Sequence, residues 1–156
     1  MKIQADWKRE LELKPIKTGN ALFTMDTDSL HELPGIYVFI RKYENKAYPL
    51  YVGQASNIKR RIIQHQNNLK LMLGILRAGK GQKCVLYCTI TAKQGQRRSK
   101  ILAILEKALM DHCLTQGYEL LNKQGTKVKY EVIRFTGNRT SEDLFGRKML
   151  TKRKHE

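Results

Sequence analysis

Residues 51–65 constrain the fold more than any other stretch, because they read as a strand end, a glycine turn and a capped helix in direct succession. The strand end is apolar, and the turn leads into Ser56 and Asn57. Either polar side chain can accept a hydrogen bond from the free backbone N–H groups of a first helical turn. The sequence therefore predicts a helix over residues 57–69 that starts directly after a strand.

This helix is expected to carry a cation and an imidazole beside an apolar stripe. Arg61 and His65 are four residues apart, so they leave the same helix face one turn apart. Ile58, Ile62 and Leu69 form the neighbouring stripe, which would dock on a core. A guanidinium and an imidazole held side by side suit recognition of a phosphate. From this stretch alone, an ordinary basic helix with a half-buried histidine is the alternative interpretation.

Other stretches predict an antiparallel sheet. Residues 36–41 follow a Pro-Gly break and are β-branched and aromatic, and residues 49–52 follow a short polar turn. The short connection favours an antiparallel hairpin between them. Residues 84–91 are expected to form a third strand, and residues 127–135 alternate well enough to form a fourth at the sheet edge.

The most hydrophobic helix is predicted over residues 99–114, with Ser99 as its N-cap. Within it, Glu106 has only apolar neighbours three and four residues away. Burying an ionised carboxylate is costly unless it has a partner. An ion pair with Arg61 would satisfy it, and so would a divalent metal ion; a position at the rim of the apolar face is the alternative.

The charge of the chain points to a polyanionic partner. Its 30 Lys and Arg residues against 14 Asp and Glu give a formal net charge of +16. No run approaches the ~18 apolar residues that would span a bilayer, and no signal-peptide pattern is seen, so nucleic acid is favoured over a membrane. Three cysteines, an odd number, favour reduced thiols in a cytoplasmic protein, and their spacing is not that of a zinc finger.

With these pieces in place, the chain resembles the GIY-YIG nuclease family over about residues 33–122. Five ordered matches carry the resemblance: Gly35-Ile36-Tyr37, Tyr51-Val52-Gly53 with Val in place of the usual Ile, Asn57 followed by Arg61, Glu106, and Leu121-Asn122. An ordered set of this kind is more specific than either tripeptide alone.

The resemblance implies an α+β, sandwich-like fold with a small three-stranded antiparallel sheet flanked by helices. We expect one domain over residues 1–156, in which residues 1–32 are an N-terminal extension and residues 123–156 a C-terminal extension with a strand and a basic tail. From the sequence, residues 1–32 favour no single structure, and the tail could equally be a solvated helix end.

The resemblance also implies roles for individual residues. Glu106 would hold one Mg²⁺ (or Mn²⁺) ion, Tyr37 would position the attacking water, and Arg61 would stabilise charge on the phosphate. His65 would relay a proton or contact the phosphate, Tyr51 would orient water or phosphate, and Asn122 would support the site. Contacts to the nucleic acid are expected from exposed cations: Lys59, Arg60, Arg97, Arg98, Arg147 and Lys148.

The predicted function is therefore a metal-dependent endonuclease that hydrolyses phosphodiester bonds in DNA, as a compact stand-alone or restriction-like enzyme. RNA remains an alternative substrate. A non-catalytic nucleic-acid-binding module on the same fold is the second hypothesis, and a structural RNA-binding protein is the third. Cutting both strands would require either a homodimer or two sequential nicks.

Overall fold

The computed structural model describes residues 2–16, 21–122 and 130–152, and it divides the chain into two compact units, 1–121 and 122–156. One domain over residues 1–156, as expected from the sequence, stays a prediction. The last described strands pair with one another and not with the main sheet, which gives the second unit a separate set of hydrogen bonds.

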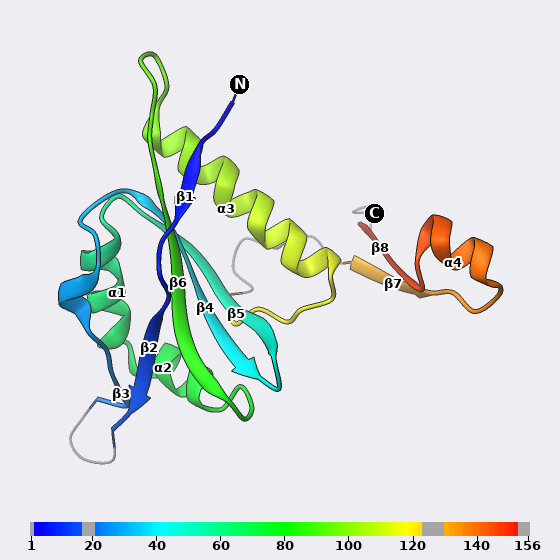
Figure 1. Ribbon diagram of the computed structural model, residues 1–156, viewed down its shortest axis with the longest axis horizontal. Coiled ribbons are helices and arrows are strands. Elements are labelled where there is room, and N and C mark those ends of the chain that lie inside the picture. The colour runs from blue at the N-terminus through cyan, green and yellow to red at the C-terminus, as the bar shows by residue number, and fades with distance from the viewer. Residues whose placement is uncertain (1, 17–20, 123–129, 153–156) are drawn as a thin grey trace. The chain divides into compact units, whose positions relative to one another are not determined.

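The centre of the first unit is an antiparallel sheet in which β4 (Gly35–Tyr43) lies between β5 (Lys46–Ala55) and β6 (Gln82–Ile90). The predicted hairpin is confirmed: β4 and β5 are joined by Glu44 and Asn45, which have φ of 48° and 62°. Two successive left-handed residues match the twist of a tight hairpin. The sheet thus contains the three strands that the sequence predicted (Figure 1).

The sheet is wider than expected, because short N-terminal strands extend it. β1 (Ala5–Trp7) and β2 (Leu11–Pro15) both pair with β6, and β3 (Phe23–Thr24) pairs with β2. Leu13 and Phe23 are each only 1% exposed, so burial of apolar side chains holds these short strands on the sheet. The expectation of a three-stranded sheet is corrected on this point.

The first two helices follow β5 in quick succession. α1 (Ile58–Gln66) starts as predicted, with the Asn57 side chain accepting a hydrogen bond from the Arg60 N–H at 3.0 Å. The helix ends three residues earlier than predicted, because Asn68 caps a new helix, α2 (Leu69–Leu76), by accepting from the Leu71 N–H. A 3₁₀ turn, η1 (Thr27–Ser29), precedes β4.

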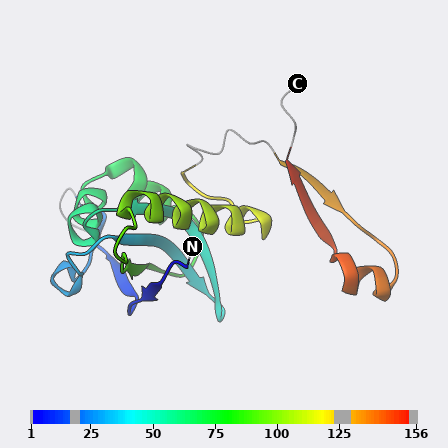
Figure 2. The same cartoon turned by 90° about the horizontal axis from the view of Figure 1, so that it is seen from above.

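α3 (Arg98–Thr115) runs along the sheet as one long helix (Figure 2). The predicted cap at Ser99 is wrong: Arg97 takes the N-cap position, and its side chain makes no capping hydrogen bond. The helix is therefore held by its apolar contacts with the sheet, including those of Ile101 and Leu102.

The two faces of the sheet carry separate apolar clusters, because successive strand residues point to opposite sides. Tyr37, Phe39, Val85 and Tyr87 pack with α1 and α2 on one face. On the other face, Ile36, Val38, Val52, Cys84 and Cys88 pack with residues of α3. β5 is the edge strand of this sheet, so both faces come together along it.

The second unit contains β7 (Tyr130–Arg134), α4 (Arg139–Phe145) and β8 (Lys148–Lys152), with β7 and β8 paired antiparallel. The predicted fourth strand is therefore found in part, but it pairs with β8 instead of the edge of the main sheet; residues 127–129 lie outside the described residues. The predicted basic tail starts with Arg147, and strand β8 follows directly from Lys148. Within the described chain, no helix is long and apolar enough to cross a membrane.

Candidate active site

Tyr37 stands at the centre of the site. It lies on β4, is 1% exposed, and its hydroxyl is 2.6 Å from Nε2 of His65 on α1. Its register partner on β5 is Gly53, and a Cβ at that position would overlap the Tyr37 hydroxyl. A Cβ at Gly35 would overlap the backbone carbonyl of Cys88 in the same way. The glycines in both tripeptides are thus required by close approach of neighbouring atoms.

Tyr51 closes the site on the β5 side. Its half-buried ring stacks on Tyr37 with 6.2 Å between the centroids, and it lies edge-on to His65 at 5.3 Å. Phe39 packs against the same three rings. This aromatic group fixes the orientation of the Tyr37 phenol and the His65 imidazole.

Arg61 lies one helical turn before His65 and is exposed. Its guanidinium hydrogen-bonds to the Tyr37 hydroxyl and to Oε1 of Gln64, the latter at 3.3 Å. The Tyr37 oxygen therefore accepts a hydrogen bond from Arg61 and shares a second hydrogen bond with Nε2 of His65. The ion pair between Arg61 and Glu106 that the sequence suggested is not formed.

Burial sets the protonation of this group. It lowers the pKa of His65 to about 4, with the positive charge of Arg61 as a second cause. It also raises the pKa of Tyr37, against the opposing effect of the hydrogen bond from Arg61. At neutral pH both side chains are uncharged, and the imidazole tautomer decides whether the Tyr37 hydroxyl or Nε2 of His65 carries the proton of their hydrogen bond.

Glu106 approaches the same edge of the sheet from the other face. It lies on α3 and is half-buried, and burial raises the pKa of its carboxyl group. Hydrogen bonds with the side chain and backbone of Gln54 oppose that shift. The negative charge of Glu106 contributes to the raised pKa of Tyr37, so the two groups interact electrostatically across β5. The sequence did not lead us to expect Gln54 as the partner of Glu106. The one available signal was its position as a polar residue between apolar neighbours on β5.

The donors present fit one hard, water-rich cation. Among the described residues, no group of three His, Cys, Asp or Glu side chains could hold a metal ion. Mg²⁺ commonly binds through one or two carboxylates and keeps several of its waters. Glu106 supplies one such carboxylate, whereas the three cysteines are free and buried with raised thiol pKa values, which do not suit a metal site.

The predicted site residues are therefore only partly brought together. Tyr37, Tyr51, Arg61 and His65 form one cluster, and Glu106 lies across β5 from it. Asn122 is the first residue of the second unit, and its role stays a prediction.

The predicted nucleic-acid contacts fall into three groups. Lys59, whose Nζ is 4.0 Å from an Asp28 carboxylate oxygen, lies beside Arg60 on α1. Arg97 and Arg98 are exposed at the start of α3. Arg147 and Lys148 belong to the second unit, where Arg147 pairs with Glu142 at 2.7 Å.

Comparison with known families agrees with this arrangement. The GIY-YIG catalytic domain matches residues 33–119, which is more than half of the chain and includes the four clustered residues and Glu106. Comparison with curated proteins finds no match, and neither does comparison with solved structures. The matched range carries a nuclease-type fold, with the two tripeptides on the paired strands β4 and β5. The chain belongs to the GIY-YIG family.

Proposed function

We propose that this protein is a metal-dependent endonuclease that hydrolyses phosphodiester bonds in DNA. The observation that carries the proposal is the hydrogen bond of 2.6 Å between the Tyr37 hydroxyl and His65, with Arg61 on the same oxygen. This arrangement holds a phenol between a cation and a proton acceptor, at the edge that Glu106 approaches from the opposite face.

Tyr37 and His65 act as a proton relay. The raised pKa of Tyr37 makes a free tyrosinate an unfavourable base at neutral pH. His65, with its pKa lowered to about 4, is neutral and presents Nε2 to the phenol. As the attacking water passes a proton to the Tyr37 oxygen, the phenol passes its own proton to His65, so no isolated tyrosinate accumulates.

Arg61 stabilises the negative charge that develops at the phosphate. Its guanidinium is exposed, fixed by Gln64 and already in contact with the Tyr37 hydroxyl. A donor fixed before the reaction costs no reorganisation when charge builds up. Tyr51, stacked on Tyr37, orients the water or a phosphate oxygen at the open side of the cluster.

Glu106 holds one divalent cation, Mg²⁺ or Mn²⁺, with Gln54 fixing the carboxylate. When bound, the cation polarises the scissile phosphate and stabilises the leaving oxygen. The substrate phosphate then lies across the β5 edge, between the relay on one face of the sheet and the carboxylate on the other.

The test is cleavage of supercoiled plasmid by the full chain with Mg²⁺ or with EDTA, beside a Glu106→Ala variant. The proposal predicts nicked or linear product only with the wild-type protein and the metal. Discrete linear fragments would identify sequence-specific cleavage, and diffuse nicking would identify a nuclease whose target is set by structure or by a partner. Intact plasmid, together with a retained gel shift, would favour the non-catalytic binding module.

A further inference from the structure

The loop between β6 and α3, together with the first turn of α3, forms a basic arm, which we define as residues 91–100. It projects at the end of β6, as the long loop at the top of Figure 1 shows. The arm contains no acidic residue and carries four cations, and Lys2 lies beside it: Lys93, Arg97, Arg98, Lys100 and Lys2 are all exposed. Among the described residues, none of these five makes an ion pair.

Gln96 gives the arm a fixed shape. Its side-chain oxygen accepts a hydrogen bond from the Lys93 N–H at 2.9 Å, and its own N–H donates to the Lys93 carbonyl at 3.0 Å. The Gln96 amide also donates to the Lys2 carbonyl at 3.3 Å, which ties the arm to the N-terminal segment. Gly95, with φ of 82°, turns the chain between them. Lys93 is therefore held on a closed turn, and the other cations of the arm follow at the start of α3, so the positions of the charges are fixed, which lowers the entropy cost of binding.

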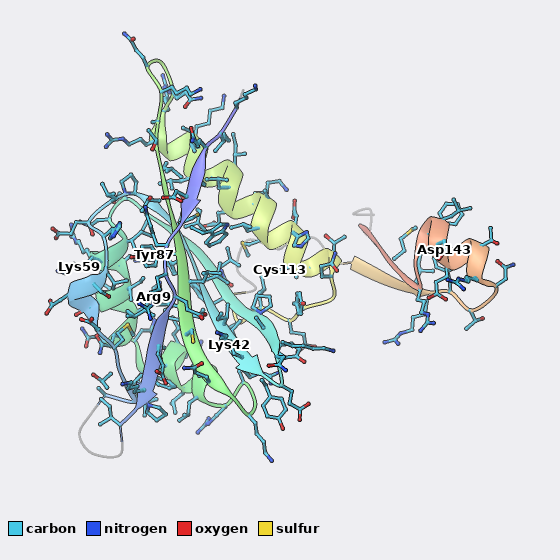
Figure 3. The ribbon with its side chains drawn as sticks, in the orientation of Figure 1. Arg9, Lys42, Lys59, Tyr87, Cys113 and Asp143 are labelled. Carbon is cyan, nitrogen blue, oxygen red and sulfur yellow. The ribbon has the colours of Figure 1, made fainter. Side chains whose placement is uncertain are left out.

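The arm lies at the same end of the sheet as Tyr37. The last residue of β6, Ile90, donates its N–H to the Pro34 carbonyl directly before β4. Arg98 and Glu106 are eight residues apart on α3, which places their Cα atoms about 12 Å apart along the helix axis. That length corresponds to roughly three to four base pairs of a duplex. The side chains of this end of the molecule are drawn in Figure 3.

We propose that the basic arm binds the phosphate backbone of double-stranded DNA that flanks the cut on the Glu106 side. The inference rests on the proposed nuclease function and adds the form and position of its substrate. The arm carries no aromatic side chain on which an unpaired base could stack, whereas surfaces for single strands combine cations with aromatic residues. Cations alone, fixed in position, suit the regularly spaced phosphates of a duplex.

The test compares two triple variants in a Glu106→Gln background, in which binding is measured without cleavage. The first changes Lys93, Arg97 and Arg98 to Gln. The matched control changes Lys46, Lys70 and Lys80 to Gln, which are exposed cations of the first unit away from the arm. Affinity for a short duplex and for its single strand is measured over a series of salt concentrations.

The arm variant is expected to bind the duplex more weakly, with a salt slope reduced by about three, because each lost phosphate contact removes about one unit. The control should keep nearly the wild-type slope. Equal slopes in the two variants would overturn the proposal. Equal losses for duplex and single strand would overturn the assignment to a duplex.

Gln96→Ala gives a second test, because it keeps every charge. We expect several-fold weaker duplex binding with an unchanged salt slope, since the cations remain but their positions are no longer fixed. Unchanged affinity for the duplex would contradict the inference that Gln96 fixes the arm in the shape that binds DNA. These binding outcomes are separate from the nuclease proposal, which fails only if the wild-type protein with metal leaves DNA uncut.

Discussion

The two faces of the sheet at β5 contribute different chemistry to one site. On the α1 face, Tyr37 and His65 are buried, uncharged and directly hydrogen-bonded. On the α3 face, Glu106 is half-buried and has Gln54 as its partner. One face is suited to moving a proton and the other to holding a cation. The contrast teaches that a glycine at the edge strand leaves no side chain between two such environments, as the proposed function requires for both to act on one phosphate.

Glu106→Gln, on the α3 side of the site, should reduce the cleavage rate more than any other substitution considered. The substitution removes the charge but keeps the shape, so we expect cleavage to fall about 10³- to 10⁴-fold, the loss of several kcal/mol of transition-state stabilisation. The variant should be at least as stable as the wild type, because burial disfavours the ionised carboxylate. Single-turnover cleavage and thermal unfolding measure the two effects. Glu119→Gln, at an exposed carboxylate, is the control.

Tyr37→Phe should remove proton transfer on the α1 side of the site and leave the Glu106 carboxylate on the α3 side unchanged. The ring still packs with Tyr51 and Phe39, but the hydroxyl that links Arg61 to His65 is lost. We expect a loss of about 10²- to 10³-fold in the cleavage rate, typical of removing a proton-transfer group. Duplex binding should stay within about twofold, since one exposed cation contributes far more to DNA affinity than a buried phenol. A rate close to that of the wild type would remove Tyr37 from the chemistry.

His65 should make the α1 side sensitive to acid. Its pKa is lowered to about 4 in the folded protein, against about 6.5 in an unfolded chain. Between these values only the unfolded chain binds the proton, so the folded state loses stability as the pH falls from 6.5 towards 4. From pH 7 to pH 4.5 the wild type should lose about 2–3 kcal/mol more than His65→Gln does.

Urea unfolding at the two pH values measures this difference. His112→Gln, at an exposed histidine on α3, should lose the same stability as the wild type. Identical losses for His65→Gln and the wild type would show that His65 is not held neutral by burial.

Gly53→Ala should change the packing of β5, the edge strand that separates the two sides of the site. The added methyl group would overlap the Tyr37 hydroxyl, so we expect a loss of about 1–3 kcal/mol in stability and weaker cleavage. Gly74→Ala is the matched control, because its Cβ would lie 3.3 Å from the flexible end of Leu121 and it sits inside α2. That control should gain stability, since alanine favours a helix interior. Unchanged cleavage in Gly53→Ala would argue against close packing of Tyr37 on β5.

Local signals in the sequence marked most of the residues that the structure brings together at β5. Asn57 caps α1 as expected, and the spacing of Arg61 and His65 brings both to the Tyr37 hydroxyl. The isolated position of Glu106 in an apolar helix marked the carboxylate. Its partner could not be predicted, because the choice between Arg61 and Gln54 depends on how α3 lies over β5, which is a tertiary property.

The parts that the sequence did not predict depend on long-range pairing. Strands β1 to β3 are too short to be recognised by alternation, and only their packing through Leu13 and Phe23 makes them strands. The strand β7 was expected on the main sheet, but its partner is β8. Local sequence specifies that a segment is extended, whereas the choice of partner follows from the whole chain.

The central claim is that one chain supplies both halves of the site, and mixing two inactive variants tests it most directly. Tyr37→Phe and Glu106→Gln are each assayed alone and then together at equal concentration, beside the wild type, on the same Mg²⁺-containing plasmid reaction. The account predicts cleavage by the wild type only, with the mixture as inactive as either variant. Cleavage restored in the mixture would show that Tyr37 and Glu106 act from different chains, and it would contradict a site built across β5 of one sheet.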